Sequence, residues 1–238
     1  MNKQPWDVDP PETGDKSEDI TFQAVGAALT QWEWFEGNLS LAFSFLIGVS
    51  HGNLAAIRAY GAIETFRGRA NMIQRAAEVY FRQQPDDIQE AQLTKILNLA
   101  LRHLSGKRNE IAHGIVQPWE IMEDGHRVVQ NGFVLVPAYY ATRKRNLPES
   151  REWWVSSITG SDSHPGTEAE PLFTAPREID LSISASIPTY FYSSIEINKI
   201  AALFTAQATQ VADVLTFLAD RIDPDDHPDD HHKYKIRL

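Results

Sequence analysis

The sequence predicts a mainly α-helical protein: an up-down four-helix bundle with a small β-rich insertion between the third and fourth long helices. Apolar residues recur at spacings of three and four over three long segments before residue 114, and over one more after residue 190. This is the pattern of amphipathic helices. From residue 115 onward apolar and polar residues alternate, and turn-forming residues become frequent, which favours short strands. Three long helices, an interruption and a fourth long helix are typical of a bundle that carries an insertion.

The N-terminal residues 1–17 are polar, acidic and contain several prolines. We therefore expect a disordered acidic lead-in rather than a signal peptide. Ser17 is the expected N-cap of the first helix, because acidic residues follow it directly and favour a helix N-terminus. This helix is expected to run from residue 18 to about residue 48. The helix carries an aromatic cluster of Trp32, Trp34 and Phe35. We expect this cluster to lie in the core or in a dimer interface, and we favour this over a platform on which bases stack.

Two further helices are expected over residues 53–84 and from about residue 86 to Gly114. Pro85 separates them, because proline cannot continue the interior of a helix, and the acidic residues after it favour a new N-terminus. We expect Ser105-Gly106 to bend or loosen the third helix just ahead of its end.

Residues 115–188 are expected to form the β-rich insertion. Its expected strands are 128–129, 132–136, 153–155 and 179–187, its turns are 123–125, 130–132 and 148–149, and residues 160–178 are expected to form a long loop. The basic run 143–145 and Trp153-Trp154 can contact RNA, although we favour an exposed loop and a packed β-corner for them.

The last long helix is expected over residues 190–222, so that residues 18–222 form a single domain. Residues 223–238 are then a charged tail. Its aspartates and histidines are suitable ligands for a divalent cation, but we favour a solvated tail. We expect no metal and no cofactor.

The composition indicates a globular protein with a substantial core, since 42% of the residues are hydrophobic. Cysteine is absent, which excludes disulfides and cysteine nucleophiles. We expect a soluble cytoplasmic protein without a membrane segment. The net charge of −10 argues against a nonspecific grip on nucleic acid. Positive charge is nevertheless concentrated locally, because residues 51–114 hold nine Lys/Arg and six Asp/Glu.

The third helix is expected to end on Lys107-Arg108-Asn109-Glu110-Ile111-Ala112-His113-Gly114, where glycine serves as a helix stop. A rotation of about 100° per residue puts Asn109 and His113 on one face of the helix, with Arg108 beside it. A guanidinium, an amide and an imidazole thus gather near one helix end. Such a set can hold a phosphate and move protons beside it.

This arrangement, Arg108-Asn109 followed by three residues and His113, resembles the signature of the HEPN superfamily. Its members look like antiparallel helical bundles, and many are metal-independent RNases whose site forms where two subunits face each other. Often they are toxins of bacterial defence systems. The resemblance covers residues 18–114 and 190–222, whereas the β-rich insertion departs from the minimal family pattern.

The resemblance implies a metal-independent endoribonuclease that acts as a homodimer, with an antitoxin protein as a possible partner. His113 would be the general acid/base, because imidazole titrates near neutrality. Arg108 would clamp the phosphate and the transition state, and Asn109 would orient the imidazole or hold the phosphate. One protomer supplies one histidine, while an acid and a base together require two, which a C2 dimer provides.

Three further cations are expected to contact the RNA: Lys107, Arg67 and Arg69. The alternative hypothesis is a catalytically inactive HEPN-like module that uses the same fold to bind RNA or a protein. A histidine near a helix C-terminus is favoured there by the helix dipole alone, and Glu110 is expected to be a surface partner of Lys107. The two hypotheses differ in whether replacing His113 abolishes RNA cleavage.

Overall fold

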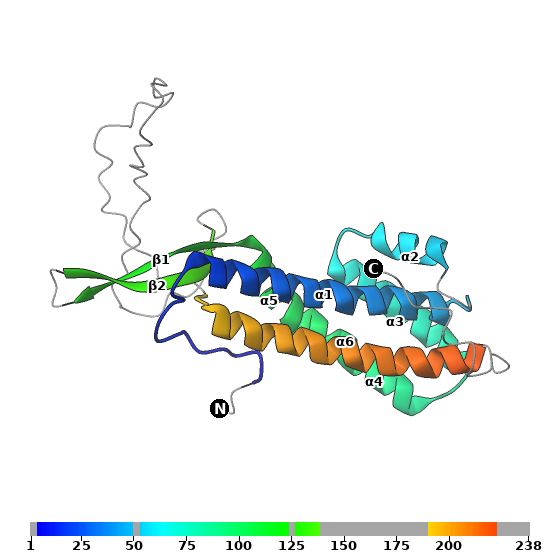
Figure 1. The fold of residues 1–238 in the computed structure, drawn as a ribbon. Coiled ribbons are helices and arrows are strands. Elements are labelled where there is room, and N and C mark those ends of the chain that lie inside the picture. Colours follow the sequence, from blue (N-terminus) through cyan, green and yellow to red (C-terminus); the bar gives the residue numbers. More distant parts are fainter. Residues whose placement is uncertain (1–3, 50–52, 124–126, 139–189, 223–238) are drawn as a thin grey trace, which may run out of the picture.

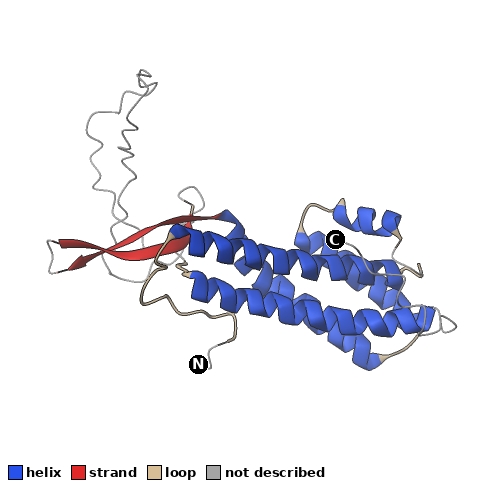
Figure 2. Ribbon diagram, viewed as in Figure 1, coloured by secondary structure: helices blue, strands red, loops and turns tan. Residues whose placement is uncertain are grey.

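The structure, a computed structural model, describes residues 4–49, 53–123, 127–138 and 190–222. Within them the protein is mainly helical and carries a small two-stranded antiparallel sheet. Figure 1 shows the two longest helices lying side by side, with the shorter helices packed against them and the sheet extending beyond the end at which α1 begins. Figure 2 shows that helices make up nearly the whole body of the molecule, with the two strands at one end.

The first and last helices form the centre of the fold. They are α1 (Glu18–Leu46) and α6 (Ser194–Ile222), close to the spans predicted from the sequence. The rings of Trp32 and Phe204 meet edge to face with their centroids 5.2 Å apart, and both side chains are at most 1% exposed. Each such side chain contributes about 2–3 kcal/mol through burial. Asn38 also donates to the Ala208 carbonyl across the contact at 3.0 Å.

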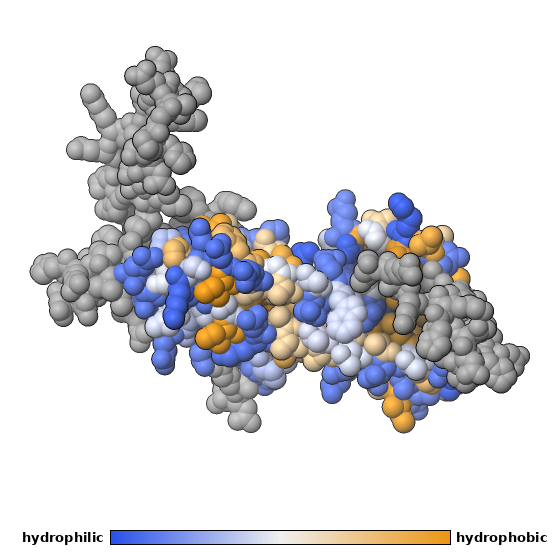
Figure 3. All heavy atoms as spheres, in the orientation of Figure 1, coloured by the Kyte–Doolittle hydropathy of each residue, from blue (hydrophilic) through white to orange (hydrophobic). Residues whose placement is uncertain are grey.

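The aromatic cluster of α1 divides between core and surface. Trp32 and Phe35 are buried, whereas Trp34 is 47% exposed. Figure 3 shows hydrophilic residues over much of one face of the molecule, with smaller hydrophobic areas between them. Helix α6 is long and apolar enough to cross a membrane by length and composition. A core helix of a water-soluble protein meets the same criterion, so this property is weak evidence for a membrane-spanning helix.

The second predicted helix, over residues 53–84, is wrong as a single element. The chain forms α2 (Leu54–Gly61) and α3 (Phe66–Gln83) with a break between them. Each helix has its own N-cap, since Asn53 accepts from the Ala55 amide at 2.7 Å and Thr65 accepts from the Gly68 amide at 3.1 Å. A capping side chain supplies a partner for an amide that has none within the helix, so residue 65 starts a new helix.

The third predicted helix forms, with one irregular stretch. It consists of α4 (Asp87–Leu99), the π-helical segment η1 (Ala100–Leu104) and α5 (Ser105–His113). Asp86 caps α4 by accepting from the Gln89 amide at 3.1 Å. The irregularity was expected at Ser105-Gly106 and lies directly before it. A π segment adds a residue to the helical turn and so rotates α5 relative to α4.

The sheet consists of β1 (Gly114–Glu123) and β2 (Arg127–Pro137), paired antiparallel. The predicted turn at 130–132 is wrong, because these residues lie inside β2. The register of the β1–β2 pair shifts opposite these residues, between Pro118 and Glu120 of β1, as in a β-bulge. Gly132 adopts a φ of +100°, which glycine tolerates and other residues rarely do.

Residues 4–17 were expected to be disordered, but the structure places them against the folded body. The Gly14 amide donates to the Asn131 carbonyl at 2.7 Å, and Asp15 pairs with Phe133 through two backbone hydrogen bonds. The Asp15 carboxylate also accepts from the Ser194 amide and from its hydroxyl, at 2.8 and 2.6 Å. This segment therefore joins the sheet to the start of α6. Ser17 occupies the N-cap position of α1 without a side-chain hydrogen bond.

Several predicted elements lie outside the described residues. They are the strands at 153–155 and 179–187, the turn at 148–149, the loop at 160–178, the basic run at 143–145 and the tail at 223–238. The described part of the insertion is the β1–β2 pair.

Candidate functional site

The motif residues occupy the last turns of α5, where the chain passes from helix into strand. His113 is the final helical residue, and Gly114 begins β1 with an extended backbone (φ −75°, ψ 163°). Glycine is required there by packing rather than by a left-handed conformation. A Cβ at this position would lie 2.8 Å from the Leu135 side chain and 3.0 Å from the Glu110 carbonyl oxygen. Close contact with β2 thus fixes where the helix ends.

Arg108 and Asn109 lie together at this helix end. The Arg108 Nη1 donates to the Asn109 Oδ1 at 3.2 Å, and its Nη2 lies 3.9 Å from the Glu33 carboxylate on α1. The Arg108 side chain is 33% exposed, while its Nε is buried and has no hydrogen-bond partner among the described residues. The guanidinium is thus held at the surface with donors available for a further acceptor.

His113 is exposed to solvent, as is Asn109. The structure describes no hydrogen bond between these two side chains, and Asn109 instead accepts from Arg108. In a single copy of the chain the amide therefore orients the guanidinium. The imidazole stands at the surface, open to a ligand or to another protein molecule.

Lys107 and Glu110 form a network with a tyrosine that the sequence analysis did not single out. Lys107 Nζ lies 3.0 Å from the Glu110 Oε2, as expected for this pair. Both side chains also reach the Tyr192 hydroxyl, which accepts from Lys107 at 2.7 Å and donates to Glu110 at 2.5 Å. Burial, and then the charge of Glu110, raises the pKa of Tyr192 well above its ordinary value. The network ties α5 to the chain just before α6.

This network engages Lys107 within the protein, and its expected contact with RNA stays a prediction. Its side chain is 22% exposed, and its ammonium is occupied by Glu110 and Tyr192. Hydrogen bonds that involve charged groups are stronger than neutral ones. Its role in the structure is to hold the motif-bearing helix in place.

Arg69 is likewise engaged within the protein. Its Nη1 lies 2.7 Å from the Glu36 Oε2, and its Nε donates to the Ile63 carbonyl at 2.8 Å. Glu36 is buried and also accepts from Trp32 Nε1 at 3.0 Å and from the Tyr60 hydroxyl at 2.9 Å. Burial alone would lower the pKa of Arg69, but the hydrogen bond and charge of Glu36 outweigh it and raise the pKa. The sequence analysis missed this hub, because a lone glutamate in an apolar stripe carries no pattern.

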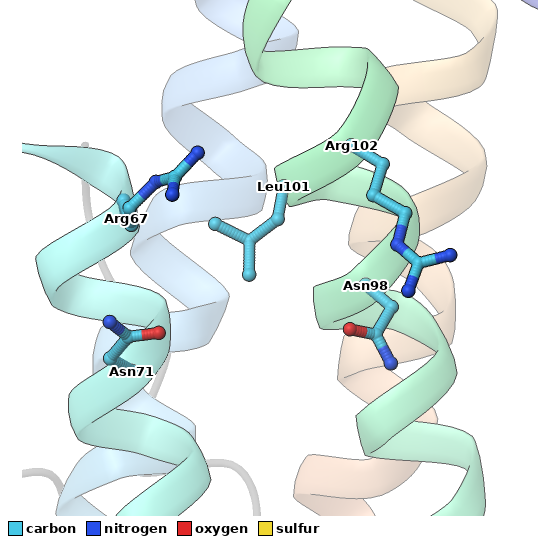
Figure 4. Close-up of a pocket in the computed structure, with 5 residues that line it drawn as sticks. All are labelled: Arg67, Asn71, Asn98, Leu101 and Arg102. Atoms are coloured by element: carbon cyan, nitrogen blue, oxygen red, sulfur yellow. The ribbon is translucent and has the colours of Figure 1, made fainter.

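Arg67 is in a different position, since it is exposed and lines a cavity of about 400 Å³ between α3 and the α4–η1 run. Figure 4 shows Arg67 and Asn71 on one wall, with Asn98, Leu101 and Arg102 on the other. Sequence reasoning singled out Arg67 alone. The spacing of four residues within each wall was the available signal for the others.

The chemistry that the described residues offer is that of cations, amides and one exposed imidazole. In these residues no group of three or more His, Cys, Asp or Glu is placed to hold a metal ion. Comparison of the chain with protein families, with curated proteins and with solved structures gives no match. The function is therefore argued from the site itself.

Proposed function

We propose that the protein is a metal-independent endoribonuclease of HEPN type that cleaves RNA at a composite site between two copies of the chain. The observation that carries the proposal is the placement of Arg108, Asn109 and His113 on the last turns of α5, with the imidazole open to solvent. In this proposal α1, α3, the α4–η1–α5 run and α6 are the four long elements of an up-down bundle.

Each residue has a chemical task in the proposed reaction. The Arg108 guanidinium binds the scissile phosphate, because its planar fork matches two phosphate oxygens and stays charged. Asn109 holds that guanidinium in place through the 3.2 Å hydrogen bond. His113 transfers protons, either from the ribose 2′-hydroxyl or to the leaving 5′-oxygen. The attack of the 2′-oxygen on phosphorus yields a 2′,3′-cyclic phosphate and a free 5′-hydroxyl, which requires no metal and no water.

The proposed dimer follows from the number of histidines. The reaction needs a base and an acid, and one chain places one imidazole in the motif. Two copies related by a two-fold axis, with their α5 ends facing, supply both. Two exposed apolar side chains support an interface there. Trp34, next to the Glu33 that meets Arg108, is 47% exposed, and Ile115, two residues after His113, is 44% exposed.

The cellular role belongs to the same proposal. We propose a toxin or defence effector in the cytoplasm, held in check by an antitoxin protein. The buried stripe of α6 supports a water-soluble protein, since residues along it such as Ile197, Phe204 and Val211 are fully buried against the rest of the fold.

A catalytically inactive binding module remains the second candidate, and one observation favours it. The His113 imidazole has no orienting hydrogen bond among the described residues, whereas catalytic histidines are usually fixed through their second ring nitrogen. In this candidate the same helix end binds RNA or a protein without cleaving.

The test is cleavage of a mixed RNA pool by purified protein in EDTA. The wild type is compared with Arg108→Ala and His113→Ala, and with Arg82→Ala, which removes an exposed arginine from the last turn of α3. We expect fragments with 2′,3′-cyclic phosphate ends from the wild type and from Arg82→Ala, and none from the two motif variants. Equal cleavage by all four proteins indicates a contaminating RNase. RNA binding without cleavage in all four supports the inactive module.

A further inference from the structure

The cavity between α3 and the α4–η1 run has two matched walls. On α3 the pair is Arg67 and Asn71, and on the opposite run it is Asn98 and Arg102, each pair four residues apart and therefore on one helix face. Figure 4 shows Arg67 and Asn71 on one wall, and on the other the Arg102 side chain extending toward Asn98. Each wall thus contributes one guanidinium and one amide to the cavity. Leu101 is the remaining lining residue.

The two arginines of the cavity differ from Arg69 and Arg108 in having no acidic partner among the described residues. Arg69 and Arg108 each have a glutamate within 4 Å, whereas no carboxylate lines the cavity. In the part of the chain that the structure describes, neither Arg67 nor Arg102 has an ion pair or a hydrogen bond from its side chain. The two positive charges at the cavity thus have no carboxylate among the described lining residues to balance them, and a bound anion would supply the opposite charge. The geometry therefore favours a negatively charged ligand.

The π-helical segment adds an independent observation. Leu101 and Arg102 belong to η1 (Ala100–Leu104), so the irregular turn sets where these two side chains stand on the cavity wall. A π segment is rare, and such segments are found frequently at functional sites. The irregularity thus lies at the cavity.

We propose that this cavity binds a nucleotide through its phosphate group, with Arg67 and Arg102 as the phosphate ligands. Arginine forks bind phosphate oxygens with two parallel hydrogen bonds. The Asn71 and Asn98 amides each offer donors and an acceptor for the base or the ribose, and Leu101 supplies an apolar contact. The volume of about 400 Å³ lies within the range of small-molecule sites, roughly 300–1,000 Å³.

This inference does not depend on RNA cleavage, because none of the cavity residues belongs to the motif. The nucleotide can be a free molecule or one unit of an RNA strand, and the phosphate recognition is the same in both. The cavity is formed by the helical run that ends in α5, so a strand bound there is held by the element that carries His113.

The experiment measures binding of a fluorescein-labelled 2′-O-methyl oligouridylate by anisotropy. This RNA has no free 2′-hydroxyl and resists cleavage through that group, so that the result is separate from the outcome of the proposed RNase reaction. Uridine 5′-monophosphate, uridine and inorganic phosphate serve as competitors. The test variant is R67Q/R102Q. Its matched control is R82Q/K95Q, which removes the same charge from exposed positions on α3 and on the α4–η1 run.

We expect R67Q/R102Q to bind at least about tenfold more weakly than the wild type, while R82Q/K95Q binds as the wild type does. The salt dependence should weaken in R67Q/R102Q by a slope of about 0.7 for each phosphate that is lost. Asn71→Ala, a change at an exposed position, should weaken binding less and provides a variant that keeps both charges.

Competition then identifies the ligand. Displacement by uridine 5′-monophosphate identifies a free nucleotide as sufficient, and binding of the oligonucleotide alone identifies the strand; both support the site. The proposal is overturned if the wild type binds neither, if both double variants lose affinity equally, or if uridine competes as well as its monophosphate. Equal competition by inorganic phosphate overturns recognition of the nucleoside.

Discussion

The sharpest prediction on the fold concerns Arg69, which the sequence suggested as an RNA ligand and the structure places on Glu36. The change is Arg69→Ala. It leaves the Glu36 carboxylate, 8% exposed, with two neutral donors and no counter-charge. Breaking a fully buried ion pair costs about 3–5 kcal/mol. Because the Arg69 side chain is 23% exposed and water can reach the site, we expect a loss of about 2–3 kcal/mol.

The assay is urea unfolding followed by circular dichroism, with Arg67→Ala as the matched control. Arg67 has the same side chain on the same helix but is exposed, so its replacement should change stability by less than about 0.5 kcal/mol. For a chain of this size the loss at Arg69 corresponds to a fall of about 5–10 °C in melting temperature. A double-mutant cycle of Glu36→Gln with Arg69→Met should show coupling. Equal stability of Arg69→Ala and Arg67→Ala would refute the assignment of Arg69 to the hub.

Two further predictions test the same fold. Burial, and then the charge and hydrogen bond of Glu36, raises the pKa of Tyr60 above its ordinary 10.0, so the folded protein keeps a proton that the unfolded chain loses. Above pH 10 the free energy of unfolding of the wild type should therefore fall by up to about 1.4 kcal/mol per pH unit more than that of Tyr60→Phe. Urea unfolding over pH 8–11 measures both. Equal pH dependence of the two free energies would contradict this. Gly132→Ala should cost about 2–3 kcal/mol, because φ is +100° and a Cβ would lie 2.5 Å from the Gly14 carbonyl carbon. Limited proteolysis of Gly132→Ala should then cut within residues 4–15. The control is Gly37→Ala, which has open space around it and should leave stability unchanged or raise it. A Gly132→Ala protein that resists cutting and has wild-type stability would contradict the prediction that Gly132 holds this segment in place.

The long helices were predictable from the sequence because their apolar stripes are local patterns. The spans of α1 and α6 agree with the prediction to within a few residues. The break between α2 and α3 was missed since the apolar spacing continues through it; Thr65 three residues ahead of Gly68 was the available cap signal. The bulge at Gly132 was mistaken for a turn because the segment that pairs beside it, at Gly14, lies 118 residues away.

The site was predictable only where it is local in sequence. Arg108, Asn109 and His113 lie within one helical turn and a half, so their proximity follows from the helix itself. Tyr192, far along the chain, accepts a hydrogen bond from Lys107, and Glu36 forms an ion pair with Arg69 of another helix. Such long-range pairs decide which positively charged side chains are neutralised. They cannot be predicted from the residue pattern of one segment alone.

The central claim is that two His113 side chains from two copies act together. The direct measurement is RNA cleavage by mixtures of wild-type and His113→Ala protein after full subunit exchange, at constant total protein. If each site needs both imidazoles, the mixed dimer and the variant dimer are both inactive, and an equal mixture retains about a quarter of the wild-type activity. Retention of about half would show that each copy acts alone, and would contradict the composite site.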